Sequence, residues 1–333
     1  MKVSIIAGGA GFVGCNLLPL LAAEGRQLVI LDNLCRGREE HLDTVRKIAG
    51  DRVHFRNVDL SVCAVTQQTF AFAQSLGTVD EVWHLAANSD IPAGVMDANV
   101  DLRDTFMTTF SLLEAMKAHK VGTLHFASSS AIYGDLGGVP LHESIGPLLP
   151  ISNYGAMKLA SEALISAAAE SYLERVNLFR FPNVVGAPAT HGVILDFINK
   201  LKHNAGRLDV LGDGTQQKAY LHVSDLVSAM MHIRNSHDFS KVFPINIGPV
   251  DEGVTVRFIA ESVTQRVSPA AEIFFGTGNR GWVGDVPKFQ YSVERLRQSG
   301  WSPRRNSADA VRYAIDQIAT QEGFDAAAEA THE

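Results

Sequence analysis

Cysteine, basic charge and uninterrupted apolar stretches are all scarce in this chain of 333 residues. The three cysteines, Cys15, Cys35 and Cys63, have no Cys-x-x-Cys spacing, so we expect a reducing compartment and neither a disulfide framework nor a zinc site. The 29 Lys and Arg against 36 Asp and Glu give a formal charge of −7, which argues against nucleic acid or an anionic membrane as partner. The twelve His show no ligand spacing, so we expect no metal.

Membrane-spanning segments are also absent from the sequence, because no stretch of about 18 apolar residues occurs. The apolar N-terminus resembles a leader peptide, but four glycines interrupt it and no small-residue cleavage site follows. We therefore expect a cytoplasmic protein. Hydrophobic residues at 46% and charged residues at 20% are ordinary for a soluble globular chain with one large or two modest domains.

A glycine-rich turn between a strand and a helix is the first functional pattern. The β-branched run Lys2–Ala7 predicts a buried strand, Gly8-Gly9-Ala10-Gly11-Phe12-Val13-Gly14 follows it, and Cys15–Glu24 has helical spacing. In this context Gly8 permits a tight turn, Gly11 lets backbone amides approach a pyrophosphate, and Gly14 lets the helix pack on the strand. The pattern predicts a dinucleotide site with the phosphates at the helix N-terminus.

An acidic residue follows the second predicted strand, Gln27–Leu31. Asp32 stands about twenty residues beyond the glycines, where a carboxylate bonds the adenosine ribose and repels a 2′-phosphate. This favours NAD over NADP. Arg36 and Arg38 point the other way, although a solvated loop explains them equally well.

Strand and helix signals alternate up to about residue 180 and predict a doubly wound parallel sheet. Strands Val53–Asn57, Val79–Leu85 and Thr123–Ala127 end at Asp59, at the small residues Ala86 and Ala87, and at Ser128–Ser130, and a long helix is expected over Leu102–Lys117. Asp59 fits the adenine edge or a simple turn. Beyond Val176–Phe181, Gly and Pro become frequent. We expect a Rossmann-type domain over residues 1–180 and a smaller substrate-binding lobe over 181–325, with exchange of chain between them.

Tyr154 and Lys158 lie four residues apart in a segment with helical character, so their side chains share one face. An ammonium beside a phenol favours the phenolate, so we expect a lowered pKa for Tyr154 and a proton acceptor for a sugar hydroxyl. A hydroxyl from Ser128–Ser130 could bridge the same proton. The spacing alone also fits a surface Tyr and Lys, and gains meaning only with the preceding motifs.

Together, in this order, these motifs resemble the extended short-chain dehydrogenase/reductase family, in its NAD-dependent nucleotide-sugar epimerase/dehydratase branch, with UDP-glucose 4-epimerase as the nearest functional type. The resemblance covers nearly the whole chain. It continues in Arg180-Phe-Pro-Asn183-Val-Val-Gly186, in Gly212-Asp-Gly-Thr-Gln-Gln-Lys-Ala-Tyr-Leu-His222-Val-Ser-Asp225, in Arg280-Gly-Trp-Val-Gly-Asp285-Val-Pro287 and in Gly300-Trp301-Ser-Pro303.

The resemblance implies roles for individual residues. Ser129, four before Tyr133, would be the catalytic hydroxyl, Tyr154 the base and Lys158 the group that orients the nicotinamide ribose. The implied NAD site consists of Gly8, Gly11, Phe12, Val13, Asp32, Asn33, Asp59, Leu60, Leu85, Ala86, Ala87, Ser128, Tyr154, Lys158 and Pro182. The implied substrate site consists of Ser129, Ser130, Asn183, Val193, Lys218, Arg280 and Asp285.

Three positions depart from the family pattern. Thr105 stands where the family usually has Asn, and Lys218 stands where an Arg commonly clamps the diphosphate. Trp282 occupies the place of a second Arg, so Arg280 would have to reach instead. A gate position is held by Phe289, whose ring favours UDP-glucose and UDP-galactose over N-acetylated sugars, although a core phenylalanine fits equally.

The resemblance implies 4-epimerisation of a UDP-sugar through a 4-keto intermediate, with no net consumption of NAD, by a homodimer. The dehydratases carry Asp-Glu directly after the catalytic hydroxyl, whereas this chain has Ser130 and Ala131 there, which favours epimerisation. Asp90 is a carboxylate that could take over at that place. The alternatives are a UDP-glucuronate 4-epimerase, a 4,6-dehydratase, a decarboxylase, a keto-sugar reductase and a non-catalytic NAD-binding scaffold.

Overall fold

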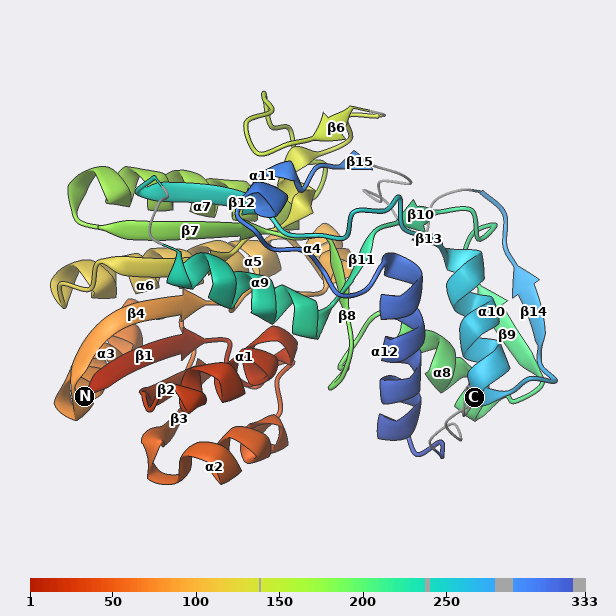
Figure 1. Cartoon of the computed structure of the whole chain (residues 1–333), viewed down its shortest axis with the longest axis horizontal. Helices are drawn as coiled ribbons and strands as arrows, with labels where there is room; N and C mark the ends of the chain where they lie inside the picture. Colours follow the sequence, from red (N-terminus) through yellow and green to blue (C-terminus); the bar gives the residue numbers. More distant parts are fainter. Residues whose placement is uncertain (138, 237–239, 279–289, 326–333) are drawn as a thin grey trace.

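A seven-stranded parallel sheet forms the larger part of the molecule (Figure 1). The structure is a computed structural model and describes residues 1–137, 139–236, 240–278 and 290–325. The strand runs of Val, Ile and Leu are buried on both faces, as parallel strands require. In spatial order the strands are β12 (Val242–Asn246), β7 (Arg175–Arg180), β5 (Thr123–Ala127), β4 (Thr78–His84), β1 (Lys2–Ala7), β2 (Gln27–Asp32) and β3 (Val53–Asn57). The predicted doubly wound fold is confirmed.

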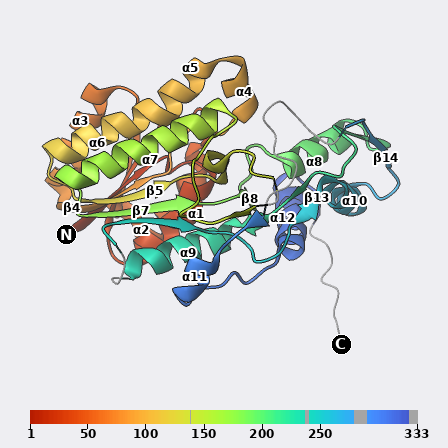
Figure 2. The ribbon, with the colours of Figure 1, turned by 90° about the horizontal axis from the view of Figure 1, so that it is seen from above.

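Helices cover both faces of this sheet (Figure 2). One face packs against α3 (Cys63–Leu76), α6 (Thr108–Ala118) and α7 (Asn153–Ser171), and the other against α1 (Phe12–Ala23), α2 (Asp43–Ala49), α9 (Val223–Asn235) and α11 (Glu294–Gln298). Short 3-10 turns η1 (Glu39–Leu42) and η2 (Gly50–Arg52) flank α2. Among the helices that the structure describes, none is both long and apolar enough to traverse a bilayer.

The second half of the chain builds a smaller lobe from paired short strands and three helices, at the right of Figure 1. The pairs are β8 (Asn183–Val185) with β11 (Tyr220–His222), β9 (Arg207–Val210) with β14 (Glu272–Phe275), and β10 (Gln217–Lys218) with β13 (Val254–Thr255). The helices are α8 (Val193–His203), α10 (Val256–Val267) and α12 (Ser307–Gln321), which share a separate apolar core. One more pair, β6 (Pro140–Leu141) with β15 (Gln290–Tyr291), lies beside the sheet.

Two elements that follow the lobe strand β11 belong to the sheet: α9 packs on it and β12 adds its edge strand. A buried ionic cluster attaches α9 to the sheet. Glu81 of β4 accepts hydrogen bonds from Arg234 Nε of α9 at 2.9 Å and from Ser4 Oγ at 2.7 Å, and an Arg26 guanidinium nitrogen lies 3.3 Å from Glu81 Oε1. Burial raises the pKa of the Glu81 carboxyl, but His125, and after it Arg234 and Arg26, outweigh burial and keep this pKa below its ordinary value. The division of the chain at residue 180 stays a prediction.

The long helix expected over Leu102–Lys117 is interrupted. After α4 (Ile91–Met96) and α5 (Ala98–Asp101), the backbone forms a π-helical turn, η3 (Leu102–Met107), before α6 begins at Thr108. The hydroxyl of Thr108 donates to the Thr105 carbonyl at 2.9 Å, and that of Thr109 to the same carbonyl at 3.1 Å. Such side-chain bonds compete with the regular backbone ladder. A periodicity argument treats the segment as one helix and misses this turn.

Candidate active site

A cavity of about 790 Å³ opens at the carboxyl ends of β1, β4 and β5, where the sheet meets the lobe that contains α8 and α12. Every described residue that the sequence assigned to a cofactor or substrate site lines this cavity. From the NAD set these are Gly8, Gly11, Phe12, Val13, Asp32, Asn33, Asp59, Leu60, Leu85, Ala86, Ala87, Ser128, Tyr154, Lys158 and Pro182, and from the substrate set Ser129, Ser130, Asn183, Val193 and Lys218. Arg280, Trp282, Asp285 and Phe289 lie outside the described residues. The individual roles stay predictions.

The glycine turn forms a cradle at one end of the cavity. Gly8 has a φ of +79°, and a Cβ there would lie 2.6 Å from Ala86 N, so only glycine fits between β1 and the end of β4. A Cβ on Gly14 would lie 2.5 Å from Gly8 O, so α1 sits directly on the turn. Gly11 is the N-cap of α1 and no side chain caps the helix, which leaves its first N–H groups available to an anion. These features fit a dinucleotide.

Asp32 connects this turn to the end of β2. Its side chain is 8% exposed, and its carboxylate accepts Ala10 N at 3.0 Å and Leu34 N at 2.9 Å. Burial raises the pKa of Asp32, and these backbone hydrogen bonds oppose that effect. Asp59 lines the same cavity, and its carboxylate accepts a hydrogen bond from Ser61 N at 2.9 Å. The side chain therefore stabilises the local turn and also contributes to the cavity wall.

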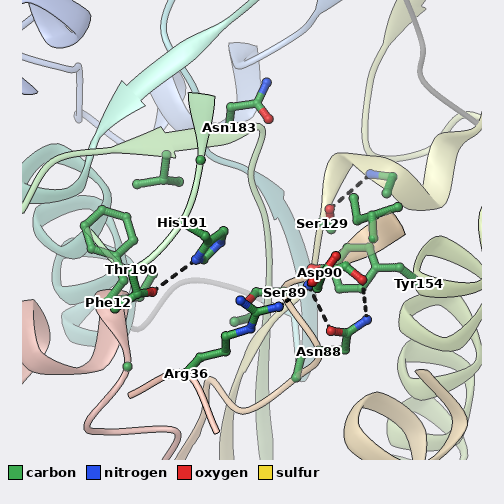
Figure 3. A pocket seen from close by; sticks show the side chains of 18 of the residues that line it. Phe12, Arg36, Asn88, Ser89, Asp90, Ser129, Tyr154, Asn183, Thr190 and His191 are labelled. Atoms are coloured by element: carbon green, nitrogen blue, oxygen red, sulfur yellow. Dashed lines mark hydrogen bonds and ion pairs between the residues drawn. The ribbon is translucent and has the colours of Figure 1, made fainter. Parts of the chain in front are cut away.

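Arg36, whose positive charge is an argument against NAD in the sequence, is paired with a carboxylate in the structure. Its guanidinium forms an ion pair with Asp90, which also caps α4 by accepting Ala93 N at 3.0 Å (Figure 3). The Ala93 amide and Arg36 keep the pKa of Asp90 below its ordinary value. The positive charge of Arg36 in the cavity lining is therefore already paired with a carboxylate.

Ser129, Tyr154 and Lys158 come together at the opposite side of the cavity (Figure 3 labels the first two). Tyr154 and Lys158 both lie on α7, and Gly155 allows α7 to approach the 3-10 turn η4 (Ser130–Tyr133), since a Cβ on it would lie 2.5 Å from Ala131 O. Ser129 is the N-cap of η4, and its hydroxyl forms a hydrogen bond with Tyr154. Ser129 is therefore the serine that interacts with Tyr154, and its catalytic role stays a prediction.

The expected lowering of the Tyr154 pKa is wrong for this structure. Burial raises the pKa of Tyr154 to about 12, and the hydrogen bond with Ser129 only partly opposes it. Burial also lowers the pKa of Lys158 to about 7. The Lys158 Nζ lies 5.9 Å from the centroid of the Tyr154 ring and donates to the Ala127 carbonyl at 2.6 Å. Desolvation acts on both groups and outweighs their mutual effect.

Ser128 is directed away from the reaction centre. Its hydroxyl donates to Glu162 Oε1 at 2.5 Å, and Glu162 also binds Arg180 through two hydrogen bonds of 3.0 and 2.6 Å. Arg180 in turn donates to Tyr133 Oη at 3.1 Å. This buried network joins α7, β7 and both ends of the loop that carries Ser129.

Gln216 and His191 are two of the polar cavity residues that sequence reasoning missed. Gln216 is 3% exposed and lines the cavity, and its Oε1 has no hydrogen-bond partner within the described part of the chain. His191 faces the cavity from the loop before α8 and bonds Thr190 Oγ1 at 3.1 Å (Figure 3). Gln216 belongs to a motif used for the resemblance, but no local signal shows which of its polar side chains point inward.

Comparison with known proteins agrees with this geometry. The model of the NAD dependent epimerase/dehydratase family matches residues 4–248. The UDP-glucose 4-epimerase of Corynebacterium glutamicum is 30% identical over 319 residues, which cover 90% of each chain. The crystal structure of a UDP-galactose 4-epimerase is 31% identical, with a TM-score of 0.81 over 96% of this chain and 99% of the other. The Thermus thermophilus UDP-glucose 4-epimerase, solved as a complex with NAD, is 27% identical with a TM-score of 0.81, over 96% of this chain and 99% of that one.

Proposed function

The chain belongs to the NAD-dependent epimerase/dehydratase family, and we propose that it inverts C4 of a nucleotide-diphosphate sugar, with UDP-glucose and UDP-galactose as the substrate pair. The observation that carries this proposal is the group formed by Ser129, Tyr154 and Lys158 at one side of a cavity whose other end has a dinucleotide cradle. The similar epimerases that act on these sugars support the choice of substrate.

The cradle residues are suited to hold NAD. The amides at the start of α1 would bind its diphosphate, and Asp32 would accept hydrogen bonds from its ribose. NAD, when bound, supplies a ring that takes up a hydride and later returns it.

Tyr154 would exchange a proton with the sugar hydroxyl, directly or through Ser129. Burial raises the pKa of Tyr154 to about 12, so the phenol is protonated near neutral pH and would accept a proton only where a neighbouring positive charge stabilises the phenolate. Lys158 would stabilise the phenolate while the Ala127 carbonyl holds its ammonium in place.

The residues that follow Ser129 favour epimerisation over loss of water. Ser130 and Ala131 offer no carboxyl group for an elimination at C5 and C6. Asp90, the remaining candidate for that role, is bound to Arg36 and to the N-terminus of α4. Its carboxylate is therefore already bound to a guanidinium and a backbone amide.

The proposal is tested by incubating the purified protein with UDP-glucose, and separately with UDP-glucuronic acid, in deuterated water. We expect UDP-galactose from the first substrate and no deuterium at C5 by NMR and mass spectrometry. A 4-keto-6-deoxy sugar, a pentose product or deuterium at C5 would contradict the epimerase proposal, because each requires chemistry beyond hydride and proton exchange at C4.

A homodimer through α6 and α7 is the assembly we propose. The two helices lie side by side over one face of the sheet, where the hydroxyls of Thr109 and Ser161 are hydrogen-bonded to each other at 3.0 Å. Leu102 and Phe110 remain 43% and 36% exposed on this layer. We expect light scattering to report a dimer at micromolar concentration and Phe110→Glu to weaken it. Phe274→Glu, at a comparably exposed ring in the lobe, is the control, and a monomeric wild type would contradict the assembly.

A further inference from the structure

Asp101, which has no part in the reaction derived above, is a completely buried carboxyl group behind the helix that carries Tyr154 and Lys158. It ends α5 and is 0% exposed. Its Oδ1 accepts Asn88 Nδ2 at 2.9 Å. Its Oδ2 is buried and has no hydrogen-bond partner among the residues that the structure describes. A buried acceptor without a hydrogen-bond partner lowers the stability of the folded protein. We therefore expect Asp101 to have a function that offsets this loss.

The backbone around Asp101 is shaped to admit this carboxylate. A Cβ on Gly94, in α4, would overlap Asp101 Oδ2, so the close approach depends on glycine. The Gly94 carbonyl accepts Asn153 Nδ2 at 2.8 Å, and Asn153 directly precedes Tyr154 at the start of α7. Asp101 therefore packs against the same short segment that is hydrogen-bonded to the first turn of the catalytic helix.

Asp101 is connected to the cavity through its hydrogen bond with Asn88. Asn88, its hydrogen-bond donor, lines the cavity at the end of β4 and donates its own backbone N–H to Thr105 Oγ1 at 3.1 Å. Thr105 lies on the π-helical turn that starts directly after Asp101. A turn of this kind is common at functional sites. It also places Thr105, a departure from the family pattern, in the same hydrogen-bonded group as Asp101.

Charged groups face Asp101 from each neighbouring element. Asp90 lies at the start of α4, Asp104 on η3 and Lys158 on α7. Burial raises the pKa of Asp101, the Asn88 hydrogen bond lowers it, the two aspartates raise it and Lys158 lowers it. In return, the Asp101 charge raises the pKa values of Lys158 and Tyr154. His84, on β4, is buried close enough to Lys158 for the ammonium to lower its pKa.

Glu162 is the other carboxylate that acts on Lys158, and it differs in one respect. Its charge raises the pKa of Lys158 more than the Asp101 charge does, but both of its oxygens are bonded to Arg180, and one also accepts the Ser128 hydroxyl. A guanidinium therefore neutralises much of the Glu162 charge. No cation among the described residues is bonded to Asp101. The uncompensated negative charge behind the catalytic pair is that of Asp101.

We propose that Asp101 is a positioning residue of the reaction centre: its carboxylate keeps Lys158 in the ammonium form beside Tyr154 and holds Asn88 at the edge of the cavity. The role in turnover rests on the proposed function, whereas the effect on Lys158 does not. Burial alone favours neutral Lys158, and a neutral amine cannot stabilise a phenolate. A negative charge without a partner of its own opposes that tendency.

The direct test is the titration of Lys158 in Asp101→Asn, which removes the charge and keeps the shape. Lysine side chains labelled with ¹³C at Cε are followed by NMR from pH 5 to 9, and Lys158→Arg identifies the Lys158 signal. We expect a wild-type midpoint near 7. In the variant it should fall by roughly half a pH unit or more. Asp97→Asn, at an exposed aspartate of the same segment, should leave the midpoint unchanged.

Stability separates this role from a merely structural one. The pKa of Asp101 is higher in the folded protein than in the unfolded chain. The folded state therefore binds this proton more tightly, and it loses stability as the pH rises through the folded-state pKa and Asp101 becomes charged. At pH values above the folded-state pKa of Asp101, the Asp101→Asn variant should therefore be at least as stable as the wild type in urea denaturation. Loss of stability with an unchanged Lys158 midpoint, in this variant or in Asp101→Ser, would overturn the proposal.

Turnover provides the second readout. The ratio of kcat at pH 8 to kcat at pH 6 should fall in Asp101→Asn, because Lys158 loses its proton at a lower pH, and it should keep its wild-type value in Asp97→Asn. A shifted Lys158 midpoint with an unchanged ratio would overturn the catalytic part of the proposal. Because the NMR titration needs no substrate, a failure of the epimerase assignment leaves the inference about Lys158 testable.

Discussion

Tyr154→Phe lowers epimerase turnover by at least ~10²-fold and leaves the fold intact, which is the usual effect of removing a positioned proton-transfer group. The variant keeps the aromatic ring but loses the hydroxyl that bonds Ser129. The half-buried ring keeps its place on α7, so circular dichroism and the NAD content of the denatured protein should match the wild type. The measurement is kcat with UDP-galactose at saturating substrate.

Tyr172→Phe is the matched control for this result. Tyr172 lies just beyond the other end of α7, its hydroxyl donates to the Leu113 carbonyl at 2.8 Å, and neither residue lines the cavity. The same chemical change there should leave kcat near the wild-type value. Near-normal turnover by Tyr154→Phe, or an equal loss in both variants, would show that another group transfers the proton.

Arg180→Met destabilises the protein by about 3–5 kcal/mol, because it leaves the buried carboxylate of Glu162 without its partner. Both side chains are more than nine-tenths buried, and two hydrogen bonds join them. Ser128 depends on the same carboxylate, so the loop that carries Ser129 should also loosen and kcat should fall. Urea denaturation at pH 7 measures the loss of stability.

Two controls make the outcome specific to the buried pair. Arg207→Met removes an arginine from an exposed pair with Asp209, and such surface pairs contribute little to stability. The double variant Arg180→Met with Glu162→Gln should recover part of the loss, because no uncompensated charge then remains in the core. An Arg180→Met protein as stable as the wild type would contradict the importance of this network.

The sheet could be predicted well because its signals are local. The strands at Lys2–Ala7, Val53–Asn57 and Thr123–Ala127 begin and end at the predicted residues, since short apolar runs between turn residues have few other solutions in a parallel sheet. The interrupted helix before α6 was missed because its π turn arises from hydroxyl groups that bond the backbone. Strand β12 was missed because nothing near it in the sequence shows that it returns to β7.

The candidate site likewise combines features that follow from the sequence with features that only the structure shows. The glycine turn, Asp32, and the shared face of Tyr154 and Lys158 follow from residues within one turn or one connection of each other, and the sequence alone determined them. The sequence could not decide the proton affinities of that pair, the engagement of Ser128 by Glu162, or the burial of Asp101 and Gln216. A pKa depends on the solvent and charge that surround a group, and those come from elements distant along the chain. Only the tertiary structure buries Lys158 and partly buries Tyr154, so burial rather than their spacing sets the direction of both pKa shifts.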